Sequence, residues 1–327
     1  MMMNRRLFLG TTAAAVLAAP SVLRAQETVL RWGEMLPPNH PQVMMAERIA
    51  AAVKEKTGGR VDVQVFANGQ LGSGKDLMDS VVSGALALDT DGAAALGALL
   101  PRLSVLEAPY LWKDAAQLSR VAGSPVFNEI NDELLKARGI RILGLSYYGQ
   151  RHLTSGSREV HTATDMAGFK LRVPPVDTFR AMAEAWGAQA TPINFNELYL
   201  ALSQGAVDGQ ENPLPTIASA KLNEVQKYLV LTGHIITPRL IVVNEAAWTS
   251  LSEADRTAMQ EATAEGIKWQ DAELQSQETG LVETLKGGGM TVIEPDVASF
   301  REPVLAKVPA MFSDKWGAGT WDKLAAL

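Results

Sequence analysis

The sequence of 327 residues contains no cysteine, and this absence excludes several kinds of site. Without a thiol the chain has no disulfide, no Cys-ligated zinc, no iron–sulfur cluster, no thiol nucleophile and no cysteine-linked lipid anchor. Histidine is scarce as well, since the four histidines are scattered and show no H-x-x-x-H spacing. We therefore expect neither a bound metal ion nor a cofactor.

Basic residues are in the minority. There are 30 Lys and Arg against 36 Asp and Glu, a net charge of −6, which argues against nucleic-acid binding through a broad basic face. An acidic total does not exclude an anionic ligand, because one or two arginines inside a cleft can decide the local potential.

The first 25 residues resemble an export signal. Arg5 and Arg6 precede an apolar run at residues 10–19, and we predict cleavage after Ala25. The run is shorter than the ~20 residues that a membrane span needs. The segment N-R-R-L-F-L at residues 4–9 resembles a twin-arginine signal, which predicts export to the periplasm.

Cleavage at that point removes three arginines and no acid. The remaining 27 basic and 36 acidic residues give the mature chain a net charge of −9. No later segment has 18 consecutive apolar residues. We therefore expect a free, soluble product with no direct membrane anchor.

Hydrophobic periodicity predicts an α/β fold. The first half has predicted strands at residues 29–35, 61–66 and 86–88 and amphipathic helices at 42–57 and 75–83. A second series has strands at 140–146, 170–173, 228–232, 240–244 and 291–293 and helices at 178–186 and 196–204. This alternation indicates parallel or mixed sheets with helices on both faces.

One predicted helix is unusually long. Residues 252–286 contain no proline and begin with the capping box Ser252-x-x-Asp255. A continuous helix of this length spans about 50 Å, so it should bridge two lobes. We expect lobe I to hold residues 26–150 plus about 240–270, and lobe II residues 151–239 plus about 271–327. Several chain crossings between lobes favour hinge closure.

Signals for an enzyme are weak. Residues 69–76 nearly match the phosphate-loop pattern, but Asp76 replaces the hydroxyl that would hold Mg²⁺, so a glycine-rich turn before a helix is the better interpretation. There is no Gly-x-Ser-x-Gly elbow and no Cys–His pair. We expect a protein that is not an enzyme, and keep as the alternative an exported α/β enzyme acting on a small carboxylate.

Two arginines stand near predicted strand ends. Arg151 follows strand 140–146 and Arg172 lies in strand 170–173. Ligands of open α/β sheets gather outside the carboxyl ends of strands, and guanidinium binds a carboxylate through two parallel charge-assisted bonds. Without further evidence, an arginine at such a position more often forms an ion pair on the surface or within the protein than a contact with a ligand. Two further residues have two interpretations each. Asn212 either presents its amide group to a ligand or belongs to a turn before proline, and Phe195 either lines a pocket or packs in the core.

The segments N-F-N-E-L-Y-L-A-L at residues 194–202 and V-D-G-Q-E-N-P at 207–213 carry a specific resemblance. They resemble the central signature of the solute-binding proteins of TRAP (tripartite ATP-independent periplasmic) transporters, the DctP-like family. Shorter matches at residues 70–72, 108–110, 171–174 and 224–227 occur in the same order, so the resemblance covers essentially the whole mature chain.

The resemblance implies a two-lobed periplasmic-binding-protein fold with mixed sheets, a ligand cleft between the lobes and a long lobe-bridging helix. Such a receptor closes around a small organic anion and delivers it to the small and large membrane permease subunits. In the family, the arginine matching Arg172 makes the main salt bridge to the ligand carboxylate. The residues matching Arg151 and Asn212 assist it, and the aromatic matching Phe195 packs on the ligand.

One segment departs from the sialic-acid-binding members. They carry polar or charged pocket residues where this chain has Gly-Ala-Ala-Ala at residues 92–95. We therefore expect a different set of first-lobe contacts, with Gln70, Asp91 and His40 of the 37–40 loop as candidates for reading ligand hydroxyls. The expected ligand is a sugar acid, a hydroxy acid or a C4-dicarboxylate.

Overall fold

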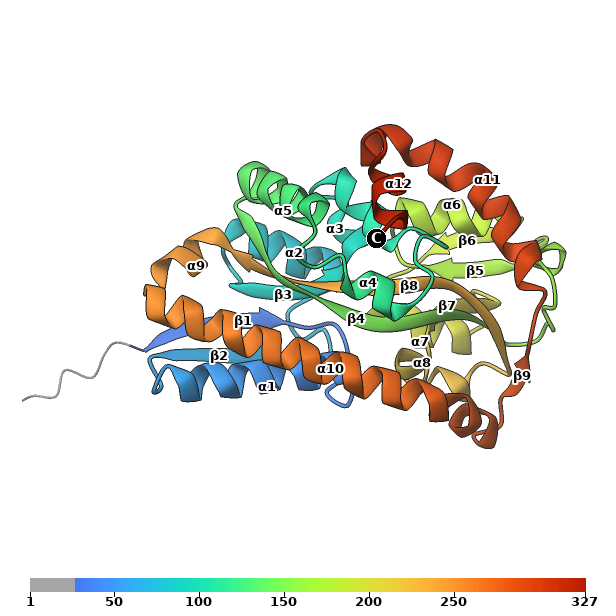
Figure 1. The fold of residues 1–327 in the computed structure, drawn as a ribbon. Helices are drawn as coiled ribbons and strands as arrows, with labels where there is room; N and C mark the ends of the chain where they lie inside the picture. The colour runs from blue at the N-terminus through green and yellow to red at the C-terminus, as the bar shows by residue number, and fades with distance from the viewer. Residues whose placement is uncertain (1–26) are drawn as a thin grey trace, which may run out of the picture.

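The computed structural model describes residues 27–327, which form two lobes joined by one mixed sheet (Figure 1). The strand order is β2-β1-β3-β8-β4-β7-β5-β6, and β9 pairs with β8. The strands are β1 (Thr28–Gly33), β2 (Val61–Phe66), β3 (Leu88–Gly92), β4 (Ile140–Ser155), β5 (Lys170–Val173), β6 (Gln189–Pro192), β7 (Gly209–Pro213), β8 (Tyr228–Asn244) and β9 (Thr291–Ile293). The predicted α/β class with a mixed sheet is confirmed, whereas the predicted export signal lies outside the described residues.

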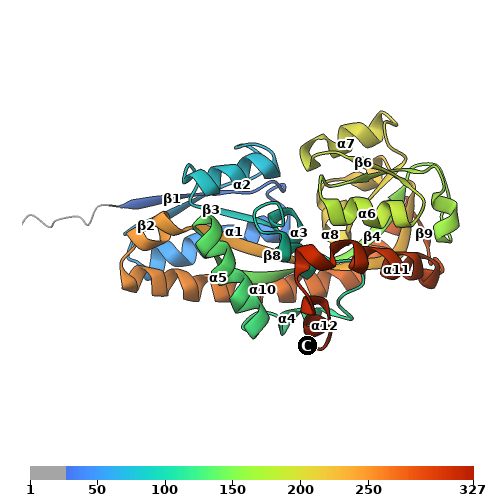
Figure 2. The same cartoon turned by 90° about the horizontal axis from the view of Figure 1, so that it is seen from above.

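Helices cover the sheet in both lobes, and the view from above separates α2 on one side from α6 and α7 on the other (Figure 2). They are α1 (Pro41–Lys56), α2 (Gly74–Ser83), α3 (Ala93–Leu96), α4 (Ala115–Ser119), α5 (Pro125–Arg138), α6 (Asp177–Ala185), α7 (Phe195–Ser203), α8 (Leu214–Ser219), α9 (Glu245–Ser250), α10 (Glu253–Gly287), α11 (Val297–Trp316) and α12 (Thr320–Ala325). None of the helices in the described part of the chain is both long and apolar enough to span a bilayer.

Two long antiparallel strands carry the sheet from one lobe into the other. β4 was expected to stop at residue 146, and β8 was expected as two strands, but both are continuous and pair along most of their length. Register shifts in β4, one of them between Tyr147 and Gly149, let the strand bend without ending. Gly149 has φ +121°, a conformation that favours glycine.

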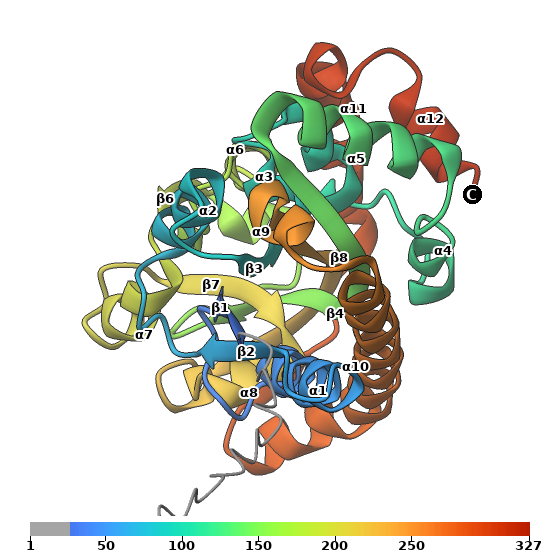
Figure 3. The ribbon, with the colours of Figure 1, turned by 90° about the vertical axis from the view of Figure 1, so that its left-hand side faces the viewer.

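The long helix α10 runs along both lobes, as predicted (Figure 1). It packs beside α1 in the first lobe (Figure 3) and reaches α8 and β9 in the second. Gly266 makes the close approach to α1 possible, because a Cβ there would lie 2.4 Å from Ile49 Cγ1. Mid-helix, Gln270 Nε2 donates to the Tyr147 carbonyl of the β4 bulge at 2.7 Å, which ties the helix to the point where β4 bends.

The end of the chain returns to the first lobe. Trp186 of the second lobe donates to the Phe300 carbonyl of α11 at 2.9 Å, whereas Trp316 at the other end of α11 donates to Ser104 Oγ at 2.8 Å. Helix α12 then packs against α5 and the 3-10 helix Pro101–Glu107. The last residues therefore differ from the expectation that all of 271–327 belongs to lobe II.

The phosphate-loop-like segment is the start of helix α2. Ser73 is its N-cap, and Asp76 Oδ2 accepts from the Ser73 backbone N–H at 2.9 Å in a capping box. The carboxylate that departs from the phosphate-loop pattern thus caps a helix, in agreement with the interpretation as a turn.

Candidate functional site

A cavity lies between the lobes, and both of them contribute residues to it. Its lining consists of Met35, Leu36, Asp91, Gly92, Ala95, Glu107, Tyr148, Arg151, Arg172, Pro174, Val176, Phe179, Phe195, Asn212 and Arg239. The structure thus brings together five predicted site residues from distant parts of the chain: Arg172, Arg151, Asn212, Phe195 and Asp91.

Arg172 of β5 lines this cavity, and both terminal nitrogens of its guanidinium are free among the described residues. It is 2% exposed, and its Nε donates to the Ile193 carbonyl at 2.9 Å. Among residues 27–327, no acceptor is hydrogen-bonded to its Nη1 or Nη2. Burial lowers the pKa of Arg172 to about 10, so the group remains cationic at neutral pH. A buried, charged fork with both terminal nitrogens free is complementary to a carboxylate.

Arg151 is held differently. It lies inside β4 rather than at a strand end, and its Nε and Nη2 donate to Glu211 Oε2 and Oε1 at 2.5 and 2.9 Å. Glu211 also lies 3.0 Å from His234 Nε2, and burial of the whole group leaves the ion pair without competing water. The opposite charge of Glu211 therefore balances Arg151, while Arg172 has no such carboxylate partner among residues 27–327.

Asn212 belongs to strand β7 and not to a turn. Its Oδ1 accepts from Arg151 Nη2 at 3.0 Å, and its Nδ2 donates to Gln210 Oε1 at 2.5 Å. Gln210 in turn donates to Thr154 Oγ1 at 3.0 Å. The Gly-Gln-Glu-Asn-Pro segment is therefore a buried polar strand that orients the cavity's second-lobe wall.

Two aromatic side chains supply the apolar part of the same wall. Phe195 opens helix α7 and is half-buried, and Phe179 lies beneath Arg151 with 5.0 Å between its ring centre and the guanidinium carbon. Both line the cavity. Phe179 excludes water from one side of the Arg151 guanidinium, which strengthens the ion pair formed there.

Arg239 lines the cavity but was not among the site residues predicted from the sequence. It lies in the middle of β8, where its Nη1 donates to Asp91 Oδ1 at 3.0 Å and its guanidinium carbon lies 4.0 Å from the Tyr148 ring centre. Burial disfavours its charge, but the neighbouring Tyr148, Asp91 and Glu107 outweigh burial and raise the pKa of Arg239. The signal that could have revealed it is a lone charge inside the apolar run of residues 235–243.

Glu107 is a second residue whose place in the cavity was not predicted. Its Oε2 accepts from the Ala94 backbone N–H at 2.9 Å, at the start of the short helix α3. Burial raises the pKa of Glu107 to about 7, although Arg239 and Arg151 act in the opposite direction. The first-lobe wall is therefore rich in carboxylates, whereas the second-lobe wall carries the unpaired arginine.

The structure does not bring Gln70 or His40 to the cavity. Gln70 is exposed in the turn before α2. His40 is fully buried, caps α1 by accepting from the Gln42 backbone N–H at 3.0 Å, and lies 3.2 Å from Thr216 Oγ1. Burial lowers the pKa of His40 to about 3, so it is neutral. It serves as a helix cap that connects the lobes behind the cavity.

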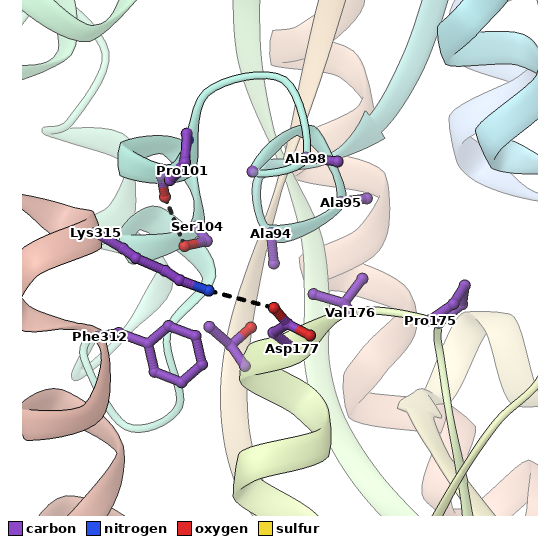
Figure 4. Close-up of a pocket in the computed structure, with 12 residues that line it drawn as sticks. Ala94, Ala95, Ala98, Pro101, Ser104, Pro175, Val176, Asp177, Phe312 and Lys315 are labelled. Carbon is purple, nitrogen blue, oxygen red and sulfur yellow. Dashed lines mark hydrogen bonds and ion pairs between the residues drawn. The ribbon is translucent and has the colours of Figure 1, made fainter.

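A second cavity of about 290 Å³ adjoins the first and shares Ala95 and Val176 with it. Figure 4 shows Lys315 of α11 reaching across to Asp177 at the start of α6, at 3.4 Å. Both side chains are more than half exposed, so this ion pair contributes little stability. Within residues 27–327 no group of three His, Asp or Glu could hold a metal ion.

A family model described as bacterial extracellular solute-binding protein, family 7, matches residues 32–315. The chain belongs to this family. Its members include the TRAP transporter solute-binding proteins, as the resemblance predicted. The sialic acid-binding periplasmic protein SiaP of Vibrio cholerae is 32% identical over 317 residues, which cover 97% of this chain and 98% of that protein.

Solved structures of the family share the two-lobed fold. A TRAP periplasmic solute-binding protein of Roseobacter denitrificans with bound L-galactonate has a TM-score of 0.86 and 30% identity, covering 91% of this chain and 99% of that one. One from Polaromonas bound to D-erythronate has a TM-score of 0.87 and 31% identity, covering 92% and 99%. The predicted two-lobed fold with its long bridging helix is thereby confirmed.

Proposed function

We propose that this TRAP solute-binding protein captures a small organic acid, namely a sugar acid, a hydroxy acid or a C4-dicarboxylate, through a salt bridge to Arg172. The observation that carries the proposal is the buried guanidinium of Arg172. This residue lines the cavity between the lobes, and its two terminal nitrogens have no acceptor in the described chain. The bound galactonate and erythronate of the two similar structures support an acid as ligand.

The other second-lobe residues assist Arg172. Arg151 and Asn212 are oriented by Glu211 and Gln210, so they present guanidinium and amide groups to the ligand without needing to reorganise. Phe195 packs on the ligand from the rim of α7. Closure of lobe I (residues 26–150, about 240–270 and the returning α12) onto lobe II excludes water and strengthens the salt bridge.

The ligand is then delivered to the small and large subunits of a TRAP membrane permease. Delivery requires a periplasmic location, and the twin-arginine-like segment at residues 1–25 supports export by that route. The similar proteins from other bacteria that are described as periplasmic support the same location.

A thermal-shift screen with organic acids, followed by calorimetry, tests the proposal. A ligand at 100 times its Kd stabilises the folded state by about 2.7 kcal/mol, so the true ligand class should raise the melting temperature clearly. Absence of a shift with every sugar acid, hydroxy acid and dicarboxylate would overturn the proposal. Conversion of the bound acid during long incubation would instead favour the exported-enzyme alternative.

A further inference from the structure

We propose that Asp91 and Glu107 make the first-lobe wall selective for hydroxyl-bearing monocarboxylates and against dicarboxylates. This inference rests on the proposed function, because it concerns the chemical groups that the ligand carries at the end away from Arg172. The evidence for the inference is the set of hydrogen bonds that the two carboxylates and the neighbouring Arg239 make and leave unmade.

Each of the two carboxylates has one oxygen that is already used and one that is free. Asp91 Oδ1 accepts from the Gly92 backbone N–H at 2.7 Å and from Arg239 Nη1 at 3.0 Å, and Glu107 Oε2 accepts from Ala94 N–H at 2.9 Å. Among the described residues, no donor is hydrogen-bonded to Asp91 Oδ2 or Glu107 Oε1. Both residues line the cavity, so a ligand meets two unfilled acceptors there.

Arg239 offsets this arrangement only in part, because its Nη1 is used by Asp91, whereas its Nε is buried without an acceptor in the described chain. Its charge is balanced by Asp91, and its guanidinium lies over the Tyr148 ring. Behind the wall, Glu34 Oε1 and Asp89 Oδ2 are sealed from solvent without a partner in the described chain, and burial raises the pKa of both carboxyls, so neither of them supplies positive charge to the wall. Since Asp91 and Arg239 pair with each other, Glu107 is the charge of the first-lobe wall that is left without an ion-pair partner among the described residues, and its carboxylate is opposite in sign to Arg172.

The carboxylate of Glu107 has little freedom to withdraw. Gly92 allows it to approach the end of β3, since a Cβ at that position would lie 2.5 Å from Glu107 Oε2 and 2.9 Å from Arg239 Nη1. The close packing and the bond from Ala94 hold the free oxygen in a defined place. An acceptor that cannot move away needs a donor from the ligand, or it remains unsatisfied when the lobes close.

Hydroxyl groups meet this requirement and a second carboxylate does not. A hydroxyl donates to a carboxylate oxygen, so a polyhydroxy acid can place its carboxylate on Arg172 and its hydroxyls on Asp91 and Glu107. A second ligand carboxylate brings no donor to this wall and places its charge beside the Glu107 carboxylate at low dielectric, which disfavours a dicarboxylate that lacks hydroxyls.

The test is calorimetry with D-erythronate and succinate, which both have four carbons, and with L-galactonate as a longer hydroxy acid. Titrations are made at pH 8, above the pKa of about 7 for Glu107, so that its carboxylate is ionised. We expect at least one hydroxy acid to bind at least about tenfold more tightly than succinate, because unpaired polar groups and like charges penalise the wrong ligand.

Two neutral variants assign the selectivity to these residues. Glu107→Gln and Asp91→Asn keep the side-chain shape, and we expect each to reduce the preference for the hydroxy acid over succinate by roughly tenfold. Glu197→Gln is the matched control, because it removes one carboxylate from the exposed first turn of α7 and should leave the preference unchanged.

The outcomes separate this inference from the proposed function. If an acid binds and Arg172→Ala abolishes its binding, but succinate binds as tightly as both hydroxy acids, the proposed function stands and the inference is wrong. The same holds if the preference persists in both neutral variants. If none of these three acids binds and the full thermal-shift screen of organic acids also shows no ligand, the proposed function itself fails.

Discussion

Arg151 and Glu211 form a bidentate ion pair of 2.5 and 2.9 Å in a fully buried site beside the cavity. Arg172, in the same cavity, has no carboxylate partner in the described chain. The two arginines that the sequence singled out therefore differ in role. Arg151 organises the second-lobe wall, and Arg172 keeps its charge and its terminal donors available for the ligand that we propose.

The first prediction concerns this ion pair. Glu211→Gln should lower the free energy of unfolding by roughly 3–5 kcal/mol, because it leaves the buried charge of Arg151 uncompensated. Urea unfolding measures the loss. Glu245→Gln is the control, since Glu245 forms an equally bidentate pair with the half-exposed Arg141 at 2.6 and 2.8 Å and should cost about 1 kcal/mol or less. Equal losses in the two variants would contradict the account.

The second prediction concerns pH and Glu34. Burial raises the pKa of Glu34 from 4.5 to about 8, although its hydrogen bond from Gln42 Nε2 at 2.6 Å acts in the opposite direction. The folded state then binds the proton more tightly than the unfolded chain does. Proton binding by Glu34 therefore contributes its full stabilisation below pH 4.5, and this contribution is lost as the pH rises to 8.

Glu34→Gln should remove this contribution. Between about pH 5 and 8 the free energy of unfolding should decrease less in the variant than in the wild type. The difference between the two decreases should be on the order of 1–4 kcal/mol. Chemical unfolding at several pH values measures the two slopes, and the exposed Glu197→Gln serves as control. Identical slopes in the Glu34 variant and the wild type would show that Glu34 is not protonated in the folded state.

The third prediction compares two glycines of α10. A Cβ at Gly280 would meet no atom within 4 Å, whereas a Cβ at Gly266 would lie 2.4 Å from Ile49 Cγ1. Gly280→Ala should stabilise the protein by about 0.5–1 kcal/mol through helix propensity. Gly266→Ala should destabilise it by about 1–3 kcal/mol, because α10 must move away from α1.

Thermal unfolding of the two variants provides the comparison. Because both substitutions are the same change in the same helix, their intrinsic helix propensities match. The difference between them therefore measures the packing of α10 on α1 alone. Stabilisation by Gly266→Ala as large as that by Gly280→Ala would mean that the helices do not pack as closely as described.

Strands with clear apolar periodicity could be predicted from the sequence. β2, β5 and β9 coincide with the predicted residues. β3 was predicted at residues 86–88 and lies at Leu88–Gly92, because Asp89 and Asp91 place carboxylates in a fully buried strand. A pattern of apolar residues cannot reveal a strand whose buried side chains are polar.

The site was predictable mainly in its second-lobe half, and Asp91 is the one predicted first-lobe residue that lines the cavity. Arg172 and Asn212 lie in or next to recognisable segments, so their chemistry could be interpreted from local sequence. Arg239 follows Pro238, which divides β8 into two predicted strands with Arg239 at their boundary. Its partner Asp91 is 148 residues away in the chain, and only the folded sheet brings the two together.

The binding affinity of Arg172→Ala tests the central claim most directly. Isothermal titration with the tightest-binding acid of the panel should show a loss of at least about 100-fold relative to the wild type, since the ligand carboxylate would then lie in the cavity without its buried partner. Circular dichroism establishes that the variant is folded. A folded Arg172→Ala protein that binds the acid as tightly as the wild type would contradict the account.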